Sequence, residues 1–96
     1  MENTVSNYER VGIDDMKKNY PDEWILLGNP EMNEQEQKVL SGVVLCHNRD
    51  KKELYHLGPP LVKNYETTAL FFNRVTPRGV SRQIGILRTV SHDIQI

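Results

Sequence analysis

The chain has 96 residues, of which 38% are hydrophobic and 26% are charged, a composition typical of one small globular domain. It excludes a disordered chain, and no apolar run approaches the roughly 18–20 residues that a membrane-spanning helix needs. One cysteine cannot form an intramolecular disulfide, and residues 1–10 have neither the basic start nor the apolar stretch of a signal peptide. We therefore expect a cytoplasmic protein.

Charge is distributed unevenly along the chain. Residues 1–46 carry 4 Lys/Arg against 9 Asp/Glu, and residues 47–96 carry 8 against 4. The two halves have net charges of −5 and +4, although the whole chain has only −1. Such a split favours association of two copies or binding of a charged partner, unless folding interleaves the halves and cancels the field.

In chain order, residues 1–11 lack an apolar pattern and are predicted to form a flexible tail. Ile13, Met16 and Tyr20 follow at helical spacing, with aspartates early and lysines late, as the helix dipole favours. A helix is therefore predicted over residues 12–20.

Two strands are predicted next. The run at 23–27 is aromatic and branched and ends at Gly28-Asn29-Pro30, whereas residues 28–38 are acidic, almost without apolar residues, and predicted to form a loop. The second strand is predicted over 39–47, where Gly42 indicates a bulge or a close backbone approach.

A second helix is predicted over 50–57. Asp50 and Glu53 have the spacing of a capping box at its start. Gly58 stands where a helix commonly ends, and Pro59-Pro60 is expected to prevent continuation.

Two further strands, 67–75 and 82–90, flank a Thr-Pro-Arg-Gly turn at 76–79, with proline and glycine where a β-turn prefers them. In the last strand a period of two places Ile84 and Ile86 on the same face.

Together these elements predict an α+β fold with a single domain over residues 12–96. An antiparallel sheet of about four strands is expected to carry both short helices on one face. The predicted strands are 23–27, 39–47, 67–75 and 82–90, and the predicted helices are 12–20 and 50–57.

Candidate functional residues lie where the second strand meets the second helix, at Cys46, His47 and Asp50. A nucleophilic cysteine needs an imidazole or a cation beside its thiolate. Neighbours in a strand point to opposite faces, so Cys46 and His47 are not expected to pair. His47, His56 and His92 lack the close spacing of a zinc signature, and we expect no metal and no cofactor.

The last hairpin is basic. Arginine beside aromatic side chains on a sheet binds single-stranded nucleic acid by phosphate contact and base stacking. The isoelectric point of about 6.3 is nevertheless far below the value above about 9 that is typical of such modules. The candidate residues for contact with nucleic acid or another partner are Arg74, Arg78, Arg82 and Arg88.

A Tyr-Pro-x-x-Trp motif opens the first predicted strand, and a Gly-led apolar strand ends in His-x-x-Asp. The positions concerned are Tyr20, Pro21, Trp24, Gly42, His47 and Asp50. Over residues 13–57 the chain thereby resembles a group of short bacterial proteins that have no established activity. The resemblance implies a small cytoplasmic prokaryotic protein and carries no catalytic or binding role with it.

The missing catalytic signatures, the small size, the uneven charge and the exposed sheet edges predict a non-enzymatic interaction module. We expect a homodimer that acts as an accessory or antitoxin-like partner of another protein, without membrane contact. Two alternatives stay open: a nucleic-acid-binding module that uses the basic hairpin, and a small-ligand binder or enzyme around Cys46, His47 and Asp50.

Overall fold

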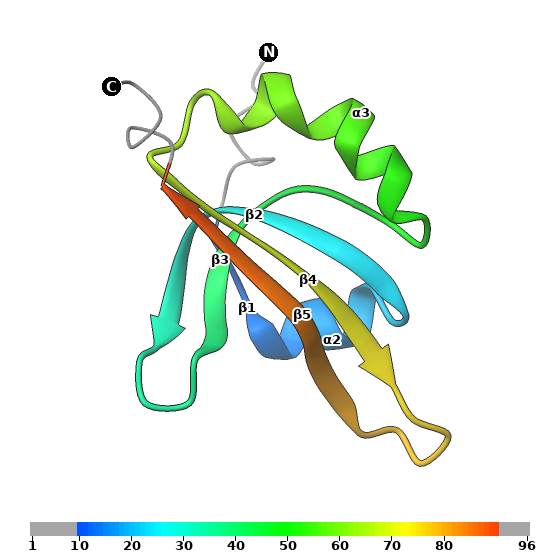
Figure 1. Cartoon of the computed structure of the whole chain (residues 1–96). Helices are drawn as coiled ribbons and strands as arrows, with labels where there is room; N and C mark the ends of the chain where they lie inside the picture. The colour runs from blue at the N-terminus through cyan, green and yellow to red at the C-terminus, as the bar shows by residue number, and fades with distance from the viewer. Residues whose placement is uncertain (1–9, 91–96) are drawn as a thin grey trace.

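The computed structural model describes residues 10–90, which form an antiparallel five-stranded sheet in the order β1-β3-β2-β4-β5 and two helices (Figure 1). The elements are β1 (Arg10–Gly12), α2 (Ile13–Asn19), β2 (Glu23–Asn33), β3 (Lys38–Asn48), α3 (Lys51–Val62), β4 (Thr67–Val75) and β5 (Ser81–Val90). The predicted α+β class and antiparallel sheet are confirmed, with five strands rather than about four.

The additional strand comes from the end of the predicted tail. In β1, Arg10 pairs with Val43 and Gly12 with Ser41 at the edge of the sheet. Three residues carry too little hydrophobic periodicity to be recognised as a strand, so only the pairing with β3 reveals it. Residues 1–9 lie outside the described part of the chain.

The two helices lie on opposite faces of the sheet, so the prediction that both cover one face is wrong. Met16 of α2 packs against Ile25 and Leu27, whereas Leu54 of α3 packs against Leu26, the residue between them. Because side chains alternate along a strand, these contacts are on different faces of β2. The run at 25–27 is apolar on both faces and needs a cover on each.

The β2–β3 hairpin is longer than predicted. Strand β2 continues to Asn33 through the residues assigned to an acidic loop, with irregular register between Gly28 and Glu31. Asn29 has φ 47°, a left-handed conformation that asparagine tolerates and that β-bulges use. Asn33 then begins the turn, because its side-chain oxygen accepts from the backbone N–H groups of Gln35 and Glu36.

Helix α3 also extends past its predicted end. Gly58 lies inside the helix and is buried, and a Cβ there would be 3.0 Å from Cδ2 of Leu26. The glycine therefore permits close helix–sheet packing instead of ending the helix. Pro59 and Pro60 have no N–H group, so the backbone carbonyls one turn earlier in the helix lack a helical donor. Both prolines are exposed, and these carbonyls lie on the same solvent-facing side of the helix.

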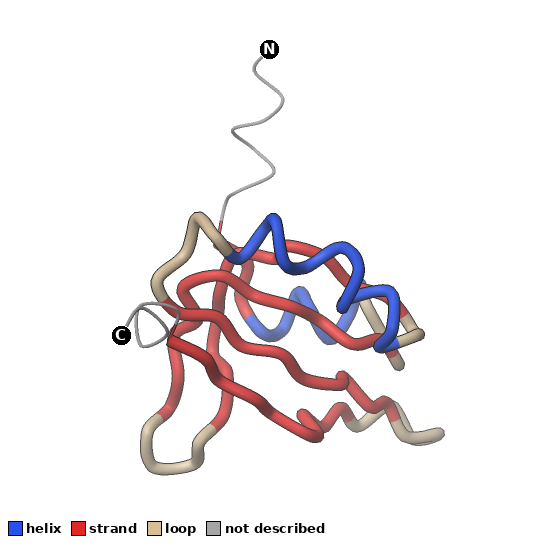
Figure 2. The backbone as a smooth tube through the Cα atoms, turned by 45° about the horizontal axis from the view of Figure 1, so that its top comes forward, coloured by secondary structure: helices blue, strands red, loops and turns tan. Residues whose placement is uncertain are grey.

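The sheet is curled, and the strands curve around one another rather than lying flat (Figure 2). The curl brings the start of β5 to the start of β3, although the two strands are not neighbours in the ladder. There the side-chain amide of Gln83 bonds to the backbone of β3, as the backbone of a neighbouring strand would. Its oxygen accepts from the Val39 N–H at 2.8 Å, and its nitrogen donates to the Val39 carbonyl at 2.9 Å.

Strand β5 contains a bulge that the sequence did not predict. Gly85 has φ 65° and the register with β4 shifts between Leu70 and Phe72. Beyond the bulge the alternation is reversed, so Ile86 packs on the α2 side while Ile84 is exposed. The predicted shared face of these two isoleucines is therefore wrong.

Within residues 10–90, neither helix is long and apolar enough to cross a membrane.

Candidate functional site

The connection between α2 and β2 is held by the buried side chain of Asn73. Its side-chain amide nitrogen donates to the carbonyls of Tyr20 at 2.9 Å and Met16 at 3.4 Å, and the backbone carbonyl of Asn73 accepts from the Asp22 N–H at 2.7 Å. Asp22 has φ 56°, and its carboxylate accepts from the Val75 N–H at 3.0 Å. These bonds fix the end of α2 against β4.

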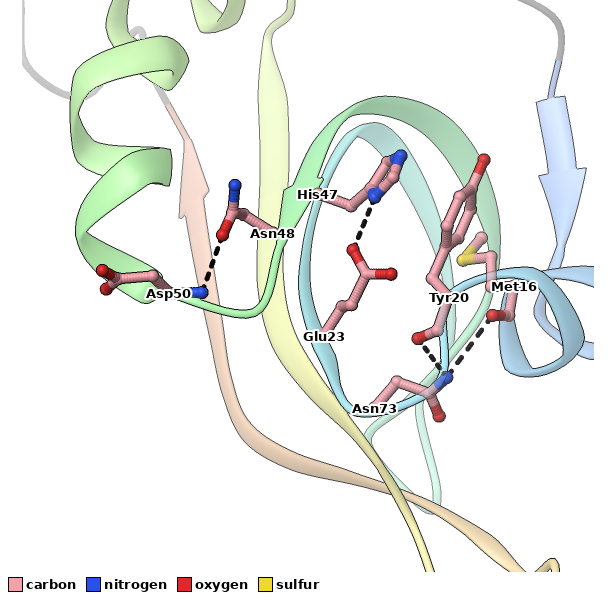
Figure 3. A network of polar contacts seen from close by, with 7 residues as sticks. All are labelled: Met16, Tyr20, Glu23, His47, Asn48, Asp50 and Asn73. Carbon is pink, nitrogen blue, oxygen red and sulfur yellow. Dashed lines mark hydrogen bonds and ion pairs between the residues drawn. The ribbon is translucent and has the colours of Figure 1, made fainter.

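This connection places Tyr20 and Glu23 beside His47 (Figure 3). Nδ1 of His47 lies 2.6 Å from a carboxylate oxygen of Glu23, and the rings of His47 and Tyr20 have centroids 4.0 Å apart. The His47 side chain is 40% exposed and that of Glu23 is 19% exposed. Tyr20 belongs to the sequence motif that we noted, and Glu23 directly precedes Trp24 of that motif.

The chemistry open to this cluster is that of a carboxylate-oriented imidazole. When Glu23 accepts the Nδ1 proton, Nε2 is left as the basic nitrogen of a neutral ring, which is the arrangement of a general base. The adjacent thiol does not join it, because Cys46 packs with Leu26 and Leu54 on the α3 face. A polar pair as exposed as this one contributes at most about 0–1 kcal/mol to stability.

Cys46 is half-buried, and burial raises the pKa of its thiol above the ordinary value. Desolvation disfavours the thiolate, which is the nucleophilic form. The environment of Cys46 is therefore the reverse of the one that activates a catalytic cysteine.

Asp50 caps α3 as predicted, since its carboxylate accepts from the Lys52 N–H at 3.0 Å. The return bond of a capping box comes from a different residue than expected. Asn48, not Glu53, accepts the Asp50 N–H, at 2.8 Å. A helix cap accounts for Asp50 without chemistry.

Histidines and acidic residues do not converge elsewhere in the described part of the chain. His56 lies exposed on α3, and no group of three or more His, Cys, Asp or Glu side chains in residues 10–90 is arranged to hold a metal ion. His92 lies outside the described residues.

The four candidate arginines do not form one surface. Arg74 and Arg82 are cross-strand partners, and Arg78 lies in the turn between their strands. Arg88 lies beyond the bulge and lines a separate hollow with Met32 and Ile86.

A groove of 310 Å³ with a mainly apolar lining lies between α3 and the β4–β5 hairpin. It arises because α3 packs over β2 and β3, while the hairpin extends away from it (Figure 1). We call it the α3 groove. Its main lining residues are Leu54, Tyr55, Pro59 and Val62 of α3 and Leu70 and Leu87 of the hairpin.

Two large side chains line the α3 groove and still face solvent. Tyr55 is 60% exposed on the helix side and Leu87 is 57% exposed on the strand side. No Lys, Arg, Asp or Glu side chain is among the residues that line the groove. Exposed apolar surface of this kind, bounded by formed secondary structure, is typical of a site of protein contact.

The α3 groove was not predicted from the sequence. Tyr55 directly follows the buried Leu54, so helical periodicity places it next to the packed face of the helix but does not indicate a groove there. Leu87 carried no signal, because the bulge at Gly85 decides which face it occupies.

Comparison with known proteins adds no relative to this description. No protein-family model matches the chain, and no match was found among curated proteins or solved structures.

Proposed function

We propose that this protein is a non-enzymatic interaction module that forms a homodimer through the α3 groove. The observation that supports the proposal is the pair of exposed apolar residues, Tyr55 and Leu87, on either side of an uncharged groove. Removing such surface from water is favourable by roughly 25 cal/mol per Å².

A second copy of the chain suits the groove because one molecule offers both parts of the contact. The groove supplies a hollow, and Tyr55 and Leu87 at its rims supply projecting side chains. Around a two-fold axis, each copy inserts its projecting residues beside the groove of the other, as an isologous interface requires. The uncharged lining means that no like charges meet there.

The position of β5 supports the same conclusion. Within residues 10–90 this strand pairs with β4 alone and forms one edge of the sheet. Leu87 lies on this edge strand. Proteins commonly cover or blunt such edges, because an uncovered edge invites association.

The test is the mass of the protein in solution, measured by sedimentation equilibrium over a range of concentrations. The wild type is expected to be a dimer. Leu87→Arg is expected to be a monomer at the same concentration, because a buried unpaired charge is costly in an interface. Leu40→Arg is the matched control, since Leu40 is a 41% exposed leucine of β3 outside the groove.

Circular dichroism of both variants establishes that each is folded. A monomeric wild type at the highest soluble concentration would overturn the proposal. Equal dissociation of the Leu87 and Leu40 variants would also overturn it, because the contact would then not depend on the groove.

A further inference from the structure

The β4–β5 hairpin is strongly basic in an otherwise acidic chain. Residues 67–90 contain four arginines and no aspartate, glutamate, lysine or histidine, which gives a net charge of +4 in a chain whose total is −1. The arginines are Arg74, Arg78, Arg82 and Arg88. The sequence does not show which of them share a face, because the bulge at Gly85 reverses the alternation along β5.

The register places two of these arginines together on the α3 side of the sheet. The side chain of Asn73 bonds to the end of α2, so the next residue of β4, Arg74, points to the opposite face. Arg82 stands directly opposite Arg74 and therefore shares its face. Arg88 stands opposite Ala69, which belongs to the buried cluster under α2, so Arg88 lies on the other face.

A row of apolar side chains crosses the α3 side next to these arginines. Trp24 of β2 stands opposite Phe72 of β4, which stands opposite Ile84 of β5. The rings of Trp24 and Phe72 have centroids 5.3 Å apart, both are partly exposed, and Ile84 is 39% exposed. The ammonium group of Lys51, the first residue of α3, lies 4.6 Å from the centroid of the Trp24 ring. We call this surface the hairpin face, and it consists of Trp24, Lys51, Phe72, Arg74, Arg82 and Ile84.

Packing between the described residues does not account for the hairpin face. Phe72 is not among the side chains of residues 10–90 that pack on either buried cluster. Arg74 and Arg82 are exposed, and in the described part of the chain neither forms an ion pair. Like charges at directly opposed positions destabilise a sheet. A bound anion would relieve this repulsion, so the arrangement favours an anionic partner.

We propose that the hairpin face binds single-stranded nucleic acid. Arginine binds phosphate through charge-assisted hydrogen bonds, and aromatic rings on a sheet stack with unpaired bases. Residues two apart on a strand are separated by about 7 Å, so Arg74 and Phe72 are placed to contact the phosphate and the base of one nucleotide.

The combination of cations and rings favours a single nucleic-acid strand over other anionic partners. The carboxylates of an acidic peptide would bind the arginines but would leave the rings of Trp24 and Phe72 unused. The bases of a duplex are stacked on one another and offer no free ring face to a sheet. Because the hairpin face has few cations, we expect weak binding at physiological salt, in agreement with an isoelectric point of about 6.3.

The experiment is a fluorescence titration of the full chain with oligothymidylate. Trp24 is the only tryptophan of the chain, so its emission reports on the hairpin face directly. Saturable quenching is expected, and log affinity is expected to fall with log salt at a slope of about −1.4 to −2.1, since each of two or three phosphate contacts contributes about −0.7. No quenching at low salt would overturn the proposal.

Two arginine variants test the phosphate contacts. Arg74→Gln and Arg82→Gln are each expected to weaken binding about tenfold and to reduce the salt slope by about 0.7, because each removes one contact. Arg88→Gln is the matched control, since Arg88 is an exposed arginine of the same strand as Arg82 on the other face. Equal losses in all three variants would show that only net charge matters and would contradict the assignment.

The stacking contact has a test of its own. Phe72→Leu is expected to weaken binding about fivefold or more while the salt slope stays the same, because it removes a ring and no charge. Circular dichroism shows whether the variant is folded. Unchanged affinity of the folded variant would refute base stacking on the hairpin face.

A polyglutamate peptide of matched length is the competing ligand. It is expected to bind more weakly than oligothymidylate. Tighter binding of the peptide that depends on Arg74 and Arg82 would overturn the proposal in favour of an acidic protein partner. The dimer is tested separately, because Trp24, Phe72, Arg74 and Arg82 do not line the α3 groove.

Discussion

Asn73 holds the end of α2 against the sheet, although little in the sequence indicates this role. It lies inside a strand that the pattern predicted, with bounds confirmed at Thr67–Val75. Strand interiors seldom favour asparagine, and that misfit was the available signal. Its amide bonds to two carbonyls of the α2 region explain the misfit.

We therefore expect Asn73→Ala to destabilise the protein by about 2–4 kcal/mol, because it removes the side-chain donor to the Tyr20 carbonyl, weakens the bonding of the Met16 carbonyl and removes packed volume. Asn64→Ala, at an exposed position after α3, is the matched control and is expected to change stability by about 0.5 kcal/mol or less. Urea denaturation of both variants measures the difference. Equal stabilities would show that the two bonds contribute nothing.

The thiol of Cys46 is expected to react slowly with iodoacetamide at neutral pH while the chain is folded. Burial raises its pKa, so less thiolate is present than in the unfolded chain. The free energy of unfolding therefore depends on pH. Below the pKa of the thiol in the unfolded chain both states keep the proton, and at higher pH the unfolded chain ionises first, so the protein becomes less stable as pH rises.

Mass spectrometry of the labelled chain, with and without denaturant, gives the two rates, and Cys46→Ser shows that the label is on this residue. Rapid labelling of the folded chain at neutral pH would contradict this prediction and favour the enzyme alternative around Cys46, His47 and Asp50.

At the scale of elements, glycines do two different things in this fold. Gly58 allows α3 to approach Leu26, and Gly85 supplies a left-handed residue at the bulge of β5. The sequence shows glycine at both positions but not which role applies. The end of α3 was mispredicted for this reason, since a helix-ending glycine and a close-packing glycine look the same in a single chain.

Gly85→Ala is expected to destabilise the protein by about 1–2 kcal/mol, because an L-residue at φ 65° meets a steric penalty of that size. A Cβ at this position has ordinary contacts with Trp24, the nearest at 3.5 Å, so strain rather than collision is responsible. Gly12→Ala is the control, since Gly12 has φ −75° and nothing within 4 Å of an added Cβ. Thermal unfolding compares the two, and equal losses would contradict the assignment to backbone strain.

At the scale of the whole molecule, the proposed dimer has a definite dependence on salt. The uneven charge of the chain suggested association of oppositely charged halves, and such association weakens when salt screens it. The α3 groove is uncharged, so the proposed dimer is expected to be about as stable at high salt as at low salt. The sedimentation measurement described above, repeated at both, distinguishes the two modes of association.

The sequence by itself determined features that rest on neighbours in the chain. The α3 cap at Asp50, the strand Thr67–Val75 and the turn after it, in which the Gly79 N–H bonds to the Thr76 carbonyl at 2.8 Å, were predicted from local residue types. Such features depend on backbone geometry and on side chains within one turn, and a single chain shows both.

Only the tertiary structure decided which faces the elements cover and which residues meet. It placed the helices on opposite sides of the sheet and brought the Glu23 carboxylate within hydrogen-bond distance of His47. These contacts follow from the two apolar faces of β2 and from the bulge and curl of the sheet. These features result from packing between residues far apart in the chain, so the hydrophobic periodicity of the sequence does not predict them.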